Sequence, residues 1–248
     1  MEALQQEYVS GNVIRLHEYI KPDRTYYKHK PSGKSSEVYA FKSKEEIAAI
    51  ITILDKHIAD ANTPTNKKIW HRNKLLFIIG INIALRGSDI SQLRWCDIVN
   101  LDGTLKDNTK IQPQKTKKTG KFVFIHYNDI VKNVVSQYIE LYPIKDLNDY
   151  IFTSKKNDKA IDTHQIWKII KGIAAEAGIS QNIGSHSLRK TFGYWVWHDS
   201  ENKDEALVLL QKIFNHSSTQ VTMHYIGIEQ DDLSKVYDKL NYGIECEF

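Results

Sequence analysis

A histidine and an arginine in "SHSLRKTFGYW" (residues 185–195) form a pair that could bind a phosphate. His186 and Arg189 are three residues apart, so a helix would carry both side chains on one face. A guanidinium can grip two oxygens of a phosphate while an imidazole hydrogen-bonds a third or takes up a proton. Such a pair alone is more often an ordinary surface feature. It needs support from elsewhere in the chain.

The stretch "NHSSTQVTMHY" (215–225) contains a second histidine, His216, and ends at Tyr225. A tyrosine can fill a core, donate a hydrogen bond or act as a nucleophile. Its ordinary pKa is near 10, so it attacks poorly until neighbouring groups activate it. The stretch leaves all three roles for Tyr225 open.

A second arginine, Arg86, follows the apolar run "LLFIIGINIAL" (75–85) and precedes Gly87. We expect Arg86 at the end of a buried helix, where a permanent charge is costly without an anionic partner. Asp89 is one candidate for that partner and a phosphate is the other. The segment alone favours Asp89.

Lysines gather in "QKTKKTGKFVFI" (114–125), between two segments of strand character. A lysine run is usually a solvated face. A lysine at the tip of a hairpin can also reach into a groove and donate a proton to a departing alkoxide. The lysines in question are Lys115, Lys117, Lys118 and Lys121.

Composition is that of a globular protein with a mildly basic balance. Of the 248 residues 41% are hydrophobic and 26% charged, and the net charge is +4. This charge permits an anionic partner. The two cysteines, Cys96 and Cys246, fit a reducing cytosol and exclude a Cys-rich metal site. We find no secretory signal and no apolar stretch long enough for a membrane span, so we expect a cytoplasmic protein.

The elements that must position these residues are mostly helices. Helical spacing begins after a capping-box pattern at Ser43 and Glu46 and continues in a second helix up to Leu85. Strand patterns at 109–114 and 121–126 flank a basic turn. Further helices are predicted at 88–95, 128–141, 163–178, 186–198, 203–214 and 230–240. The fold class is therefore mainly α with a small antiparallel β-sheet (α+β).

The first 40 residues differ from the rest of the chain. Residues 21–36 mix five basic side chains with Tyr26 and Tyr27. This composition fits a solvated arm or linker, or an arm that follows DNA with aromatic contacts. We predict a boundary between an arm at 1–40 and one domain at 41–248.

The ordered set of Arg86, a hairpin lysine, His186, Arg189, His216 and Tyr225 resembles the tyrosine recombinases, the phage integrase family. "ALRGSDISQLRWCDI" is similar to the family's first arginine box, "HSLRKTF" to its H-x-L-R box and "IFNHSSTQVTMHYI" to its third box. The similarity spans about residues 43 to 241. It implies the tyrosine recombinase catalytic-domain fold.

The resemblance assigns a role to each residue of this set. Arg86 and Arg189 would clamp the scissile phosphate, with Asp89 as a supporting acid. His186 would be a general base or hydrogen-bond partner, and His216 a donor to a phosphate oxygen. Tyr225 would form a 3′-phosphotyrosine. Lys118 is the proposed acid, because "KTGKFVFI" matches the family's hairpin, and Lys115 is the runner-up. DNA contacts are expected from Lys115, Lys117, Lys121 and Lys190.

Further expectations come with the family. The enzyme would need neither metal, ATP nor another cofactor, and it would act on double-stranded DNA at specific recombination sites. A helix at about 230–240 would exchange between protomers of a homotetramer on DNA, while the free protein would be a monomer. The protein would be cytoplasmic and nucleoid-associated, and encoded by a phage or other mobile element.

The sequence departs from the family pattern at three places. Asn215 stands where glycine is usual, although asparagine tolerates the left-handed conformation. His126 replaces a proline that often closes the second strand. Residues 1–40 have no room for the family's helical core-binding domain.

Two alternatives stay open. One is a DNA-binding regulator that has lost the chemistry, and the other is a relaxing enzyme resembling type IB topoisomerases.

Overall fold

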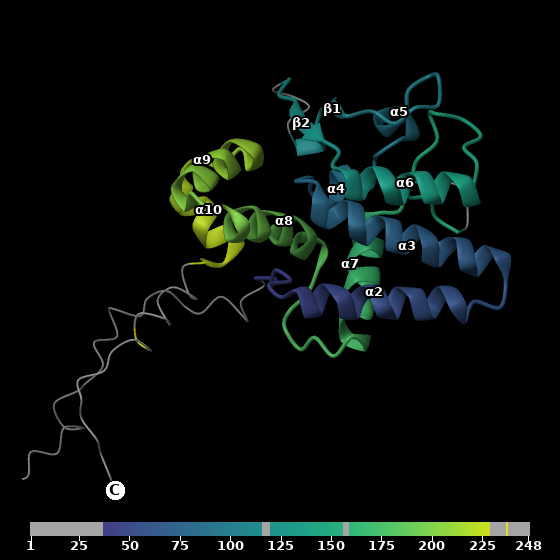
Figure 1. Cartoon of the computed structure of the whole chain (residues 1–248), viewed down its shortest axis with the longest axis horizontal. Helices are drawn as coiled ribbons and strands as arrows, with labels where there is room; N and C mark the ends of the chain where they lie inside the picture. The colour runs from purple at the N-terminus through teal and green to yellow at the C-terminus, as the bar shows by residue number, and fades with distance from the viewer. Residues whose placement is uncertain (1–36, 116–119, 156–158, 229–236, 238–248) are drawn as a thin grey trace, which may run out of the picture. The chain divides into compact units, whose positions relative to one another are not determined.

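The computed structural model describes residues 37–115, 120–155, 159–228 and 237 (Figure 1). These residues belong to one compact unit that begins at Glu37. The predicted arm up to residue 36, Lys117, Lys118 and the predicted helix at 230–240 apart from Tyr237 lie outside the described residues. The arm boundary and the exchange helix therefore stay predictions.

Two packed helices form the first layer. α2 (Lys44–Ala59) begins at the predicted capping box, in which Ser43 Oγ accepts from the Glu46 amide. α3 (Pro64–Asn82) lies along it (Figure 1). α3 ends at Asn82, three residues earlier than predicted, because Ile83 is already extended. The expectation that Arg86 closes this helix is therefore wrong.

The helix predicted over 88–95 is also wrong, since two short helices take its place. α4 (Gly87–Ile90) follows Arg86 directly, and α5 (Trp95–Ile98) begins after a turn. The turn is needed because the chain pairs with a distant segment: the Ile151 amide donates to Leu93 O and the Trp95 amide to Asp149 O. Helical periodicity over such a short window does not report these long-range bonds.

The predicted antiparallel sheet is confirmed, with shorter strands. β1 (Asn108–Ile111) pairs with β2 (Val123–His126), and Ile111 faces Val123 in the register. The first strand stops before Pro113, which has no amide proton to donate to a ladder. The Gln114 amide bonds a side chain instead, as described below.

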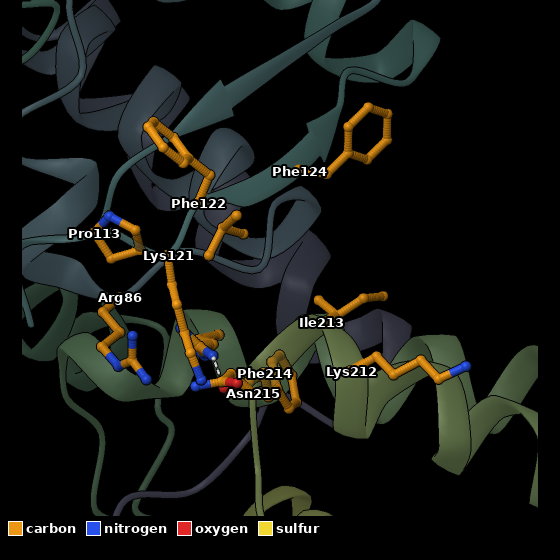
Figure 2. A pocket seen from close by; sticks show the side chains of 11 residues that line it. Arg86, Pro113, Lys121, Phe122, Phe124, Lys212, Ile213, Phe214 and Asn215 are labelled. Atoms are coloured by element: carbon orange, nitrogen blue, oxygen red, sulfur yellow. Dashed lines mark hydrogen bonds between the residues drawn. The ribbon is translucent and has the colours of Figure 1, made fainter. Parts of the chain in front are cut away.

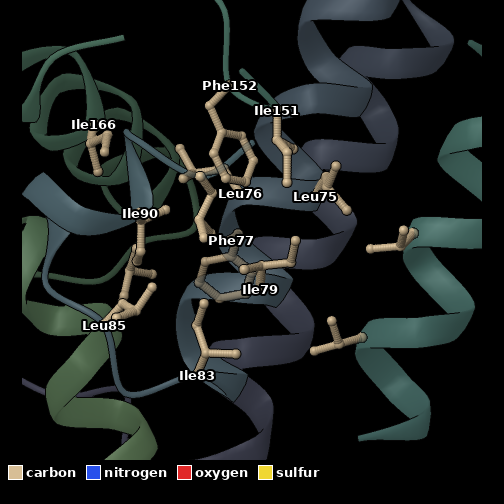
Figure 3. Close-up of a cluster of buried hydrophobic side chains, with 14 of the residues drawn as sticks. Leu75, Leu76, Phe77, Ile79, Ile83, Leu85, Ile90, Ile151, Phe152 and Ile166 are labelled. Carbon is tan, nitrogen blue, oxygen red and sulfur yellow. The ribbon is translucent and has the colours of Figure 1, made fainter. Parts of the chain in front are cut away.

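The remaining long helices are α6 (Asp129–Leu141), α7 (Thr163–Glu176), α8 (Ser185–Asp199) and α9 (Lys203–Phe214). Buried aliphatic and aromatic side chains from α3, α4, α7 and the 151–152 segment make one large core (Figure 3). Among the described residues, no helix is both long enough and apolar enough to cross a bilayer. The mainly helical fold class is confirmed.

A second, smaller apolar cluster joins α8, α9 and α10 (Thr219–Ile226). Gly193 lets these elements approach closely, because a β-carbon there would lie 2.6 Å from Ile226 Cγ2 and 2.8 Å from the Phe214 ring. Ala84 belongs to this cluster and Leu85 to the large core. Arg86 thus follows the point where the two clusters meet.

Candidate active site

Arg86 has an extended backbone conformation just before α4. It is the N-cap residue of α4, and its carbonyl accepts from the amides of Asp89 and Ile90, each at 2.9 Å. Asp89 is buried. Its Oδ1 accepts from the Gln114 amide at 2.8 Å, while its Oδ2 has no hydrogen-bond partner. Within the described part of the chain Arg86 and Asp89 form no ion pair, so the carboxylate supports this region without neutralising Arg86 at contact distance.

Arg189 lies buried in the first half of α8. Its Nη2 donates to Phe214 O at 3.1 Å, and its guanidinium carbon is 4.6 Å from the centroid of the Phe214 ring. Burial lowers the pKa of Arg189 to about 10, and the Arg86 charge acts in the same direction. The charges of Tyr225 and Asp89 oppose this shift. Arg189 remains a cation at neutral pH. Its contacts with the Phe214 carbonyl and ring fix the orientation of its guanidinium.

The two arginines line one groove of about 490 Å³ (Figure 2). Lys121 extends into it from the strand side toward Asn215, and Lys212 lies on the α9 side. Among the described residues neither arginine is in an ion pair. Two guanidiniums that line one groove without carboxylate partners are suited to bind an anion such as a phosphodiester.

His216 follows a left-handed residue, Asn215, at the end of α9. Asn215 has φ 54° and ψ 49°, so the expectation that asparagine can replace glycine here is confirmed. His216 Nδ1 is 3.1 Å from Thr222 Oγ1, and the Thr222 hydroxyl donates to Ser218 O at 3.2 Å. Because the threonine proton is used, we assign the Nδ1 proton to the histidine. In neutral His216, Nε2 is then an acceptor.

Tyr225 lies in the last turn of α10, which Gly227 ends in a left-handed conformation. Ser218 caps the start of the helix, and its hydroxyl accepts from the Val221 amide. The Tyr225 ring centroid is 5.1 Å from that of His216 and 5.4 Å from that of Phe214. Burial raises the pKa of Tyr225, while the charges of Arg189 and Arg86 lower it. The tyrosine therefore packs against the smaller core with its hydroxyl in the field of both arginines.

The surroundings of both histidines disfavour the protonated form of the ring. Burial, followed by the charges of Arg189 and Arg86, lowers the pKa of His216. The same causes, in the same order, lower the pKa of His186, and Lys190 adds to them. His186 sits in the first turn of α8 and keeps a solvent-exposed surface. Both rings can accept a proton once an anion offsets the arginine charges.

The predicted lysines fall in different surroundings. Lys121 lines the groove and Lys115 is exposed, while Lys117 and Lys118 lie outside the described residues. Lys190 is buried and pairs with Glu37, so its predicted DNA contact stays a prediction. The described residues contain no group of three or more His, Cys, Asp or Glu side chains arranged to hold a metal ion.

Three residues of the site escaped sequence reasoning. Phe214 touches the side chains of Arg189, His216 and Tyr225, and Thr222 orients His216. Glu37 pairs with Lys190 across 153 positions of sequence. Of these three, only Thr222 could have been found from local sequence. A helix capped by Ser218 would place the Thr222 side chain next to the turn that carries His216.

Comparison with known proteins shows which family this chain resembles. The model of the phage integrase family matches residues 42–231. The "Probable integrase/recombinase YoeC" of Bacillus subtilis is 38% identical over 168 residues, covering 67% of this chain and 83% of that protein. The tyrosine recombinase XerD of Listeria innocua is 23% identical over 81% of this chain and 65% of its own length.

Solved structures show the same fold. A XerH site-specific recombinase bound to a palindromic difH substrate superposes with a TM-score of 0.57 at 22% identity, covering 84% of this chain and 54% of that chain. The XerA recombinase superposes with a TM-score of 0.58 at 19% identity, covering 86% and 68%. The chain thus spans about half the length of the XerH protein.

Proposed function

Because the chain belongs to the phage integrase family, we propose that it cleaves and rejoins DNA strands with Tyr225 as the nucleophile. Tyr225 Oη attacks the scissile phosphorus as its proton leaves, and the bond from phosphorus to O5′ breaks. The product is a 3′-phosphotyrosine and a free 5′-hydroxyl. Attack by a 5′-hydroxyl from a second strand reverses the step and releases the tyrosine. The phosphoester count is unchanged throughout, so no ATP is consumed.

One observation carries this proposal: Arg189, His216 and Tyr225 all pack around the Phe214 ring. A phosphate gripped by the groove arginines would lie close to the phenol that attacks it. The guanidiniums would neutralise charge that develops on the phosphorane, which is usually the largest contribution to such catalysis. Neutral His216, with Nδ1 bonded to Thr222, has Nε2 available to accept the phenol proton, and the protonated Nε2 can then donate to a phosphate oxygen.

Several finer points belong to the same proposal. Lys118 protonates the departing O5′, with Lys115 as the alternative, and Lys121 contacts DNA from the groove wall. The chemistry needs no metal. The substrate is double-stranded DNA at specific sites of a mobile element, on which four copies assemble. The protein works in the cytoplasm.

The test uses a nicked duplex from which the strand beyond the cut diffuses away, so that a covalent adduct accumulates. Wild type, Tyr225→Phe and the control Tyr237→Phe are incubated with it in a chelator, and adducts are resolved on a denaturing gel. Tyr237 is exposed. The control therefore loses a hydroxyl by the same substitution at a site away from the core. We expect adducts with wild type and Tyr237→Phe only. An adduct with Tyr225→Phe would refute the nucleophile assignment, and DNA binding without any adduct would indicate a silent regulator.

A second pair of substrates addresses the leaving group. Lys118→Ala should form adduct slowly on ordinary DNA and recover on DNA with a 5′-bridging sulfur, whose departure needs no acid. If Lys115→Ala shows that recovery instead, Lys115 is the acid. Relaxation of supercoiled DNA without defined sites would indicate a topoisomerase-like outcome.

A further inference from the structure

Besides Arg86 and Arg189, a third cation lies close to Tyr225: Lys190. The proposed function gives this lysine no part in the chemical step. Lys190 directly follows Arg189 in α8, and only 6% of its surface is exposed. Its ammonium is 5.3 Å from the centroid of the Tyr225 ring. Its Nζ is also 2.8 Å from Glu37 Oε1. A lysine this buried, with one carboxylate partner and one aromatic face, has its ammonium held in one place.

Such a position matters because the tyrosine must lose its proton in a desolvated site. A cation near an aromatic face is attracted to the ring, which limits the orientations the ring adopts. A positive charge nearby also favours the phenolate over the phenol. Both effects serve the attack of Oη, and neither requires Lys190 to touch DNA.

We propose that Lys190 is a positioning residue for the nucleophile, which holds the Tyr225 ring and favours its phenolate, and that Glu37 anchors the Lys190 ammonium over that ring. This role rests on the proposed function of Tyr225. Glu37 is the first described residue after the N-terminal segment. The anchor therefore ties the start of the catalytic unit to the nucleophile through one ion pair.

The charge around Tyr225 comes from several elements, so the test must isolate Lys190. Arg189 shares α8 with it, His216 follows α9, and Arg86 precedes α4. The charges of His224 and Lys42 act on Glu37, and Lys42 Nζ donates to Gly227 O at the end of α10. Variants that change only the Glu37–Lys190 pair leave all of these groups in place.

The decisive measurement is the rate of adduct formation at saturating DNA, as a function of pH. Lys190→Met keeps the stem and removes the charge. We expect a loss of about two- to thirtyfold near neutral pH and a rate profile displaced to higher pH, with recovery in Lys190→Arg. Glu37→Gln removes the carboxylate that holds the ammonium, so its saturated rate should fall in the same direction as that of Lys190→Met. Lys171→Met is the matched control, because Lys171 is an exposed lysine 4.9 Å from the Trp167 ring on α7.

Each outcome decides the matter. Weaker DNA binding with an unchanged saturated rate in Lys190→Met would show that Lys190 is a DNA contact and overturn the proposal. Equal losses in Lys190→Met and Lys190→Arg without a displaced profile would reduce the residue to a packing role. If Lys190→Met fails to fold in a thermal melt, the saturated rate of Glu37→Gln decides, and an unchanged rate refutes the anchor.

Failure of the proposed function is recognised separately. If Tyr225→Phe still forms an adduct, the assignment of Tyr225 as the nucleophile is wrong, whatever the Lys190 variants show. A fluorotyrosine placed at position 225 then reports on the pair independently of cleavage. Its fluorine resonance should titrate at higher pH in Lys190→Met than in the parent protein, and identical titrations would overturn the proposal.

Discussion

The ring of Tyr225 stands at 74° to the ring of His216, with the two centroids 5.1 Å apart. His216 is itself fixed through Nδ1 by Thr222, a residue three positions before Tyr225 on the same helix. One short helix therefore carries both the phenol and the hydroxyl that orients its neighbouring imidazole. The geometry of the pair depends on that hydroxyl.

Thr222→Val should slow adduct formation about fivefold while the protein stays folded. The change keeps the buried shape and removes the group that holds His216 Nδ1, and one such hydrogen bond contributes about 1 kcal/mol. Val221→Ala is the control, since Val221 is 45% exposed on the same helix. Equal rates for wild type and Thr222→Val would show that His216 is oriented by other contacts.

Replacing either groove arginine should affect the chemical step most strongly. Arg86→Ala and Arg189→Ala each lose a permanent charge beside the phosphate, and the expected loss of rate is about 10²- to 10³-fold. The measurement is single-turnover adduct formation at saturating DNA. Lys56→Ala, an exposed change in the last turn of α2, controls for the loss of a surface cation. A small loss at Arg86 would remove it from the clamp.

Stability should rise with pH where the two histidines titrate. Burial and the arginine charges lower the pKa values of His186 and His216 from the ordinary value of 6.5. The unfolded chain then binds more protons than the folded protein below that value. Stability is complete above pH 6.5 and declines as the pH falls through the lower folded pKa values. Urea unfolding at several pH values measures this, and the double variant His186→Gln/His216→Gln should show a shallower decline.

Gly193→Ala should destabilise the contact between α8 and α10. The added methyl would lie 2.6 Å from Ile226 and 2.8 Å from Phe214, and overpacking of this kind costs about 1–3 kcal/mol. Gly172→Ala in α7 is a matched control, because a β-carbon there meets nothing within 4 Å. That change should stabilise by about 0.5–1 kcal/mol, since alanine favours a helix over glycine. Thermal melts of the two variants should move in opposite directions.

The turn before His216 offers a second matched pair. Asn215 is left-handed, a conformation that costs most non-glycine residues about 1–2 kcal/mol. Asn215→Gly should preserve stability and adduct formation, whereas Asn215→Ala should lower the free energy of unfolding by about 1 kcal/mol. Equal free energies of unfolding for Asn215→Gly and Asn215→Ala would show that the positive φ of residue 215 does not limit stability.

Local sequence determined the identity of the reactive groups and most of the helices. The order of two arginines, two histidines and a tyrosine is readable without coordinates, because their chemistry belongs to the residue types. Capping residues such as Ser43 and apolar spacing on α2, α6 and α7 predict helices, since those forces act within a few turns.

Tertiary structure alone decided how the groups meet. The split between α4 and α5 follows from bonds to residues 149 and 151, more than fifty positions away. Lys190 reads as a surface cation in sequence, yet the fold buries it against Glu37 and Tyr225. The physical reason is that burial, charge pairing and pKa depend on which distant segments share a volume. No local pattern records that information.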